Sequence, residues 1–126
     1  MHKPPRILAV CQGGNVRSVT LRFLLNYRYG FDALACGLEP NTEETRRMLY
    51  EWAAIIIVCE SSFVDLLPED MRPKANVFDI GPDVWGGSLH PELIDICDDL
   101  IQQWIAAHNK AAQSRMTSVE AVHGVD

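Results

Sequence analysis

The chain has 126 residues, a net charge of −6, and a composition that is 48% hydrophobic and 22% charged. That length suits one domain that buries a core without staples, and the acidic balance disfavours general nucleic-acid binding. No apolar run approaches the ~20 residues that cross a bilayer, and the apolar run near the N-terminus is too short for a secretory signal. We therefore expect a cytoplasmic protein that binds neither nucleic acid nor membrane.

The apolar pattern predicts strands and helices in strict alternation. The expected elements are, in chain order, strand 6–11, helix 18–29, strand 31–37, helix 42–51, strand 53–59, helix 61–67, strand 75–80 and helix 90–108. The run at 53–59 is apolar on both faces, which is typical of a central parallel strand. In the helix at 42–51, Met48 and Leu49 are predicted to face inward.

This alternation predicts an α/β fold with a single doubly wound, four-stranded parallel sheet. The expected strand order is the flavodoxin-like 2-1-3-4, with helices on both faces. The domain is expected to span 1–108, and 109–126, which lacks a sustained period, to form a loosely ordered tail. The four cysteines form no C-x-x-C pair, so we expect free thiols, no metal and no cofactor.

The first turn from strand to helix, "CQGGNVRS", has the composition of an anion site. In open α/β sheets ligands bind at the carboxyl ends of strands, where backbone N–H groups and a helix N-terminus converge. Gly13 and Gly14 permit close approach of the backbone, and Arg17 can grip two oxygens of a tetrahedral anion. Beside them, Cys11 is expected to have a pKa below the ~8.5 of a free thiol and to act as a nucleophile, with Ser18 hydrogen-bonded to the thiolate.

The same turn resembles the C-x5-R-S phosphate loop of the low-molecular-weight protein tyrosine phosphatases. Four further segments, "CGLEP", "EWAAIIIVCE", "DIGPDVWGG" and "HPELID", are similar to segments of that family, the last in a shorter bacterial subfamily, and the resemblance spans residues 6–105. It implies hydrolysis of phosphotyrosine or a small phosphomonoester through a phosphocysteine, with no metal or cofactor. Cys11 would be the nucleophile, Arg17 and the loop amides would hold the phosphoryl oxygens, and Asp83 would be the general acid and then the base. The substrate-binding residues would be Gln12, Gly13, Gly14, Asn15, Val16, Ser18 and Trp85.

The chain departs from the family pattern at several positions. Gly14 and Val19 stand where the family usually has asparagine and proline, and two further departures bear on the chemistry. Val16 stands where full-length members often have a second cysteine, and Asp83-Val84-Trp85 stands where the family has Asp-Pro-Tyr. Asp79 is a competing carboxylate, but as a strand residue it is expected to be structural.

Three other functions remain open. The first is arsenate reduction in the same loop with an external thiol. Related arsenate reductases have a cysteine near position 59 and a partner seven residues later; here that position is Leu66, so Cys59 is expected to be a core residue. The second is a phosphate- or phosphotyrosine-binding module without turnover. The third, a phosphocysteine carrier, is disfavoured by Arg17. The oligomeric state is left open.

Overall fold

A four-stranded parallel sheet forms the centre of the computed structural model, which describes residues 3–13, 16–82, 84–85 and 87–123, with side chains as far as residue 109. The sheet order is β2-β1-β3-β4, and all three neighbouring pairs are parallel. The strands are β1 (Arg6–Cys11), β2 (Asp32–Gly37), β3 (Ile55–Val58) and β4 (Ala75–Val77). The predicted fold class and the predicted order 2-1-3-4 are confirmed.

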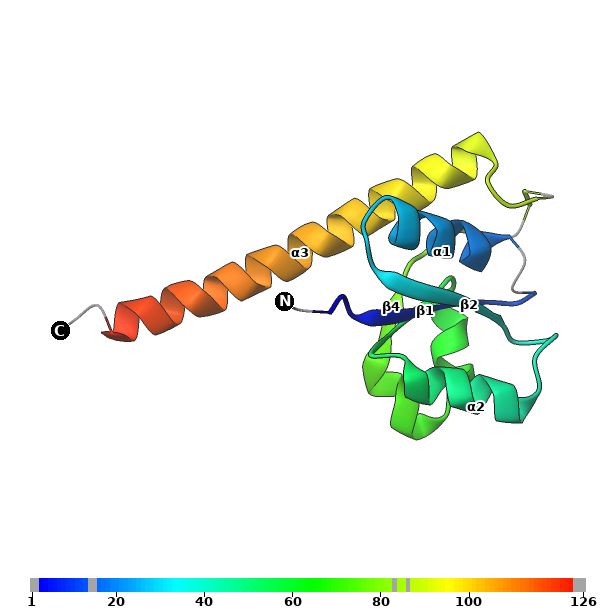
Figure 1. Ribbon diagram of the computed structural model, residues 1–126, viewed down its shortest axis with the longest axis horizontal. Coiled ribbons are helices and arrows are strands. Elements are labelled where there is room, and N and C mark those ends of the chain that lie inside the picture. Colours follow the sequence, from blue (N-terminus) through cyan, green and yellow to red (C-terminus); the bar gives the residue numbers. More distant parts are fainter. Residues whose placement is uncertain (1–2, 14–15, 83, 86, 124–126) are drawn as a thin grey trace.

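Helices cover both faces of this sheet (Figure 1). The helices α1 (Arg17–Tyr27) and α3 (Pro91–His123) lie on one face. The helix α2 (Glu43–Trp52) and two 3-10 helices, η1 (Ser61–Leu66) and η2 (Glu69–Lys74), lie on the other. Parallel strands are joined by crossover connections, so all four strands point the same way. The turns that follow the strands β1 to β4 therefore lie at the same edge of the sheet, at the carboxyl ends of the strands.

The two central strands are buried on both faces, as the continuous apolar runs in the sequence predict. Residues 7–10 of β1 and 56–58 of β3 are fully buried. A parallel sheet with helices on both faces leaves no solvated side for alternating polar residues. The carboxyl end of β1 is therefore held rigidly, and the first residues of its loop start from a fixed position.

Helix α3 is longer than the sequence pattern predicts. It continues from Pro91 to His123 and extends well beyond the sheet (Figure 1), so most of the predicted loose tail is helical. The apolar period that marks a buried helix does end near residue 108, but alanine, glutamine, arginine and methionine have high helix propensity and no proline interrupts them. Within the described part of the chain, no helix is long and apolar enough to cross a membrane.

Two local predictions are also corrected. The predicted helix at 61–67 is a 3-10 helix, Ser61–Leu66, and β4 ends at Val77, short of the predicted end at residue 80. Met48 is 71% exposed, whereas Tyr50 is the buried residue of α2. A ten-residue helix turns through few periods, so its inward face is poorly fixed by periodicity alone.

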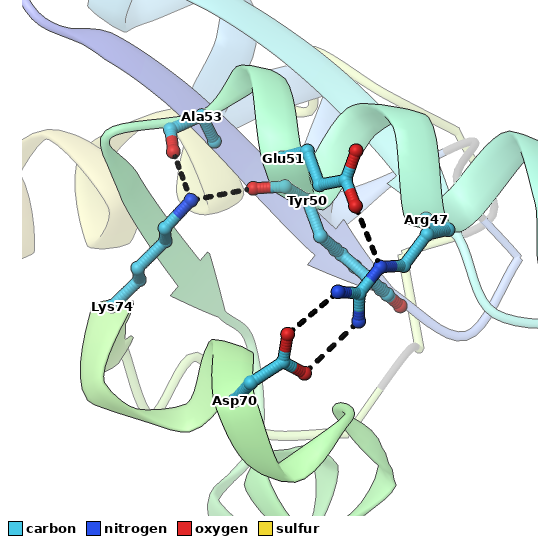
Figure 2. Close-up of polar contacts among 6 residues, drawn as sticks. All are labelled: Arg47, Tyr50, Glu51, Ala53, Asp70 and Lys74. Carbon is cyan, nitrogen blue, oxygen red and sulfur yellow. Dashed lines mark hydrogen bonds and ion pairs between the residues drawn. The ribbon is translucent and has the colours of Figure 1, made fainter.

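Polar contacts join α2 to η2 on the face of the sheet that these two helices cover (Figure 2). The Arg47 guanidinium donates from both Nη atoms to the Asp70 carboxylate, at 2.9 and 2.6 Å. Lys74 Nζ donates to the carbonyl oxygens of Tyr50 and Ala53 at 2.9 and 2.8 Å. The lysine thereby satisfies carbonyls left open at the end of α2, where the helix dipole favours a cation. Because η2 leads directly into β4, these contacts fix the position of β4 and of the chain that follows it at the edge of the sheet.

Candidate active site

The loop after β1 and the loop after β2 lie against one another at the carboxyl edge of the sheet. Leu38 N donates to Cys11 O at 3.0 Å. A Cβ atom built on Gly37 would lie 2.7 Å from the carbonyl carbon of Gly13 and 2.7 Å from Pro40 Cγ. Only glycine fits this approach, since real Cβ atoms do not come so close to backbone. Gly37 thus allows the second loop to support the start of the first.

Cys11 lies at the end of β1 with almost no exposed surface, at 1%. Its Sγ lies 3.0 Å from Ser18 Oγ, and Ser18 is fully buried in the first turn of α1. The thiol of Cys59, at the end of β3, also hydrogen-bonds with Cys11; this bond and then burial raise the pKa of Cys59 well above its usual value. Cys59 is buried, as predicted, and it belongs to the immediate surroundings of the predicted nucleophile.

Arg17 is the large polar side chain buried next to these thiols, with 1% exposure. Its Nη1 donates to Glu60 Oε1 at 2.7 Å and to Gly81 O at 3.0 Å. Its Nε is also buried and has no hydrogen-bond partner among the described residues. A buried donor without a partner is costly, and the Nε edge of a guanidinium is suited to an oxyanion. The N–H group at Arg17 Nε is therefore a donor that could bind a ligand.

Electrostatics around Arg17 favour its cation. Burial by itself disfavours the charged form, but the hydrogen bond that Arg17 donates to Glu60 and the Coulomb interactions of Arg17 with Cys59, Glu60 and Cys11 outweigh it and raise the pKa of Arg17. The first turn of α1 contains no acidic residue and its N-cap, Val16, makes no side-chain cap. The positive end of the helix dipole therefore remains uncompensated by any side chain of that turn.

Glu60 is the site residue that the sequence analysis missed. It follows Cys59 directly, at the carboxyl end of the central strand, and only this position could have drawn attention to it. With Ser61, Ser62 and Pro82, it lines a hollow of about 350 Å³ that also includes Gly81 and Asp79. Asp79 was predicted to be a structural strand residue; it lies beyond β4 and is exposed in this hollow.

The segment that follows the position of the predicted general acid is anchored to α1 at Leu89. Leu89 N donates to Thr20 Oγ1 at 3.3 Å, and the same hydroxyl donates to Val16 O at 2.8 Å. Asp83 itself lies outside the described residues. Trp85 is partly buried against the core, its ring 5.3 Å from that of His90, and its Nε1 is buried without a partner among the described residues.

The remaining predicted loop residues are only partly described. Gly14 and Asn15 lie outside the described residues. Gln12 is exposed and donates from Nε2 to Glu39 Oε1 at 2.6 Å. Gly13 has open space where a Cβ would lie. Across the described ranges, no cluster of three or more histidine, cysteine or acidic residues is arranged to hold a metal ion.

Known structures share this architecture. No family model matches the chain, and no curated protein matches its sequence. The YwlE arginine phosphatase from Geobacillus stearothermophilus is 19% identical, with a TM-score of 0.61 over 90% of this chain and 97% of that one. Wzb from Vibrio vulnificus in complex with benzylphosphonate is 20% identical, with a TM-score of 0.59 over 79% and 96%. A mutant of YwlE arginine phosphatase with a phosphorylated active-site serine is 17% identical, with a TM-score of 0.62 over 83% and 96%.

These matches define the chain by its fold. It has the architecture of the bacterial low-molecular-weight protein tyrosine phosphatases, and the resemblance predicted from the sequence is confirmed at that level. Cys11, Arg17 and Ser18 lie where such an α/β sheet holds its ligand, at the carboxyl end of a central strand beside a reversal of strand order.

Proposed function

We propose that the chain is a cysteine-dependent phosphatase that hydrolyses phosphotyrosine or another small phosphomonoester. The observation that carries this proposal is the cluster of Cys11, Ser18 and Arg17 at the carboxyl end of β1, with the Arg17 Nε left without a partner among the described residues. Phosphoryl transfer requires a nucleophile and a donor group that stabilises the oxyanion, and this cluster contains both in a buried position.

In the proposed first step, the Cys11 thiolate attacks phosphorus, the phosphorus–oxygen bond to the leaving group breaks, and a phosphocysteine forms. Arg17 and the loop amides hold the charge that spreads over the equatorial oxygens. Ser18, 3.0 Å from the sulfur, stabilises the thiolate before attack and when it leaves again. In the second step, water breaks the sulfur–phosphorus bond and inorganic phosphate is released.

Two structural neighbours support this proposal. One has a phosphorylated serine in its active site, which supports the covalent step. Another holds benzylphosphonate, an anion with a tetrahedral head, which supports the anion site. The remaining substrate contacts are proposed from the sequence: Gln12, Gly13, Gly14, Asn15, Val16 and Trp85. The catalytic unit would be residues 1–108, and a cytoplasmic location fits four cysteines that form no disulfide.

Stopped-flow kinetics with an aryl phosphate test the proposal. A phosphocysteine that forms faster than it breaks down should release a burst of phenol with an amplitude close to the enzyme concentration, followed by a slower steady rate. Inorganic phosphate should inhibit competitively. Stoichiometric binding of phosphate without release of any phenol would contradict the proposal and favour a binding module.

The proposed general acid is testable by substitution. Asp83→Asn should lower kcat for an unactivated aryl phosphate by about 10²–10⁴-fold, because the leaving phenolate then departs without a proton. The loss should shrink for a leaving group that is acidic enough to depart unaided. Asp79→Asn is the matched control, since Asp79 is exposed in the neighbouring hollow. If Asp79→Asn shows the larger loss, the acid is Asp79.

The hydrogen bond between Cys59 and Cys11 favours one second candidate, arsenate reduction. The Cys11 sulfur would displace a hydroxide from arsenate, and that hydroxide would leave as water with the proton of a second thiol. The second thiol would then attack the Cys11 sulfur, the sulfur–arsenic bond would break with its electron pair going to arsenic, and a disulfide and arsenite would be released. The second thiol would be Cys59 or a small external thiol. Arsenate-dependent consumption of thiol, measured beside aryl phosphate hydrolysis, separates the two functions.

A further inference from the structure

Two buried thiols end neighbouring strands of the sheet. The parallel register of β1 and β3 pairs Val10 with Val58, and Cys59 N donates to Val10 O at 3.1 Å. Continuing this register by one residue brings Cys59 opposite Cys11, with both side chains on the same face. Neighbouring strands lie about 4.7–4.9 Å apart, which falls within the ~4.4–6.8 Å that separates the Cα atoms of disulfide-bonded cysteines.

The other two cysteines are placed less well to react with Cys11. Cys36 is the register partner of Val10, so its side chain points to the opposite face of the sheet from that of Cys11. Its Sγ contacts Asn41 Nδ2 at 3.4 Å and Gly37 O at 3.6 Å. Cys97 lies on α3, where burial raises its pKa to about 12. Cys59 is therefore the thiol that the fold sets beside Cys11.

The environments of the two thiols fix the order in which they would react. Cys11 lies next to the Arg17 cation and to the N-terminus of α1, the surroundings that make a cysteine reactive. Cys59 is fully buried, and its hydrogen bond with Cys11 keeps its proton in place. An oxidant entering by the anion site therefore meets the Cys11 thiolate first, while Cys59 remains a thiol.

We propose that Cys59 is a resolving cysteine, and that a peroxide converts the pair into a Cys11–Cys59 disulfide. This rests on the proposed function only in taking Cys11 as the reactive thiolate. The Cys11 sulfur attacks a peroxide oxygen, the oxygen–oxygen bond breaks, and a sulfenic acid and hydroxide form. The Cys59 sulfur then attacks the Cys11 sulfur, the sulfur–oxygen bond breaks, and the thiol proton leaves with the departing hydroxide as water. Two electrons pass from the thiols to the peroxide, and a dithiol reductant returns them.

The disulfide has a defined consequence for the site. It removes the nucleophile from the anion loop reversibly, and it competes with further oxidation of Cys11 to sulfinic and sulfonic acids, which dithiols do not reverse. Since the two strand ends are already neighbours in the register of the sheet, bond formation benefits from a high effective concentration.

Peptide mapping of the full chain tests the proposal. The protein is treated with a small excess of hydrogen peroxide, alkylated, and digested with trypsin without reduction. We expect the peptide 7–17 to be linked to the peptide 48–74. The mass of the intact protein should be lower than that of the reduced protein by two hydrogen atoms. Dithiothreitol should remove the link and restore the mass. In Cys59→Ala, Cys11 should instead be found as sulfinic or sulfonic acid. Cys97→Ala is the matched control, because Cys97 is equally buried, and it should form the link like the wild type.

The outcomes separate this inference from the proposed function. Two results with the wild-type protein would overturn the inference. One is sulfinic or sulfonic acid at Cys11 with no disulfide link, and the other is a link from Cys11 to Cys36 or Cys97. Both are read from the wild type, so neither depends on a variant that folds. A link that forms in a chain without phosphatase activity supports the thiol pair and refutes the function. With an active enzyme, dithiothreitol should restore nearly all activity to peroxide-treated wild type and little to Cys59→Ala.

Discussion

Replacing Cys11 with serine is expected to lower the turnover of an aryl phosphate by a factor on the order of 10⁴ or more, the range found when an enzymatic nucleophile is removed. At neutral pH a serine hydroxyl is not ionised, and it attacks phosphorus far more slowly than a thiolate. Binding of the oxyanion should survive, because Arg17 is held by Glu60 and Gly81 independently of the sulfur.

Two measurements on Cys11→Ser separate chemistry from folding. Steady-state rates report the loss of turnover, and the rise in Tm with inorganic phosphate reports the retained site, since a ligand that binds only the folded state stabilises it in proportion to RT ln(1 + [L]/Kd). Cys36→Ser is the matched control: it removes the sulfur of another cysteine with 1% exposure and should keep its activity. Wild-type turnover in Cys11→Ser would show that water attacks the substrate directly.

The sheet was predictable because its signal is local and repeated. The continuous apolar runs of β1 and β3 can only be buried on both faces, and this requires helices on both sides of a parallel sheet. The loop of the site was predictable for a related reason. A strand, two glycines, an arginine and an amphipathic helix are adjacent in the chain, so their placement at one end of β1 follows from connectivity.

The rest of the site depends on contacts between distant segments. Glu60 pairs with Arg17 across forty-three positions, and no pattern near either residue indicates that partner. The neighbourhood of Cys59 and Cys11 follows from the register between β1 and β3, which the sequence leaves open. The same holds for Met48, which is exposed because of how α2 is rotated about its axis when it packs on the sheet. Sequence reasoning thus found the nucleophile and the anion donor but not the residues that support them.

Replacing Arg17 with lysine is expected to lower kcat/KM by about 10²–10³-fold, the loss that follows removal of one oxyanion donor. An ammonium keeps the positive charge but cannot present two parallel N–H groups to a phosphoryl oxygen pair. It can still reach Glu60, whose carboxylate accepts from Arg17 at 2.7 Å, so the variant should fold. The inhibition constant of inorganic phosphate should rise together with the loss in kcat/KM.

Arg22→Lys is the matched control for this prediction, because Arg22 is exposed on the same helix five residues later. It should keep wild-type kinetics and phosphate inhibition. Circular dichroism on both variants checks that α1 is intact. Equal activity of Arg17→Lys and Arg22→Lys would mean that charge alone is sufficient, and that the Nε of Arg17, which has no partner among the described residues, does not bind the substrate. A loss confined to Arg17→Lys would instead assign transition-state stabilisation to the fork of the guanidinium, with Glu60 holding that fork in position.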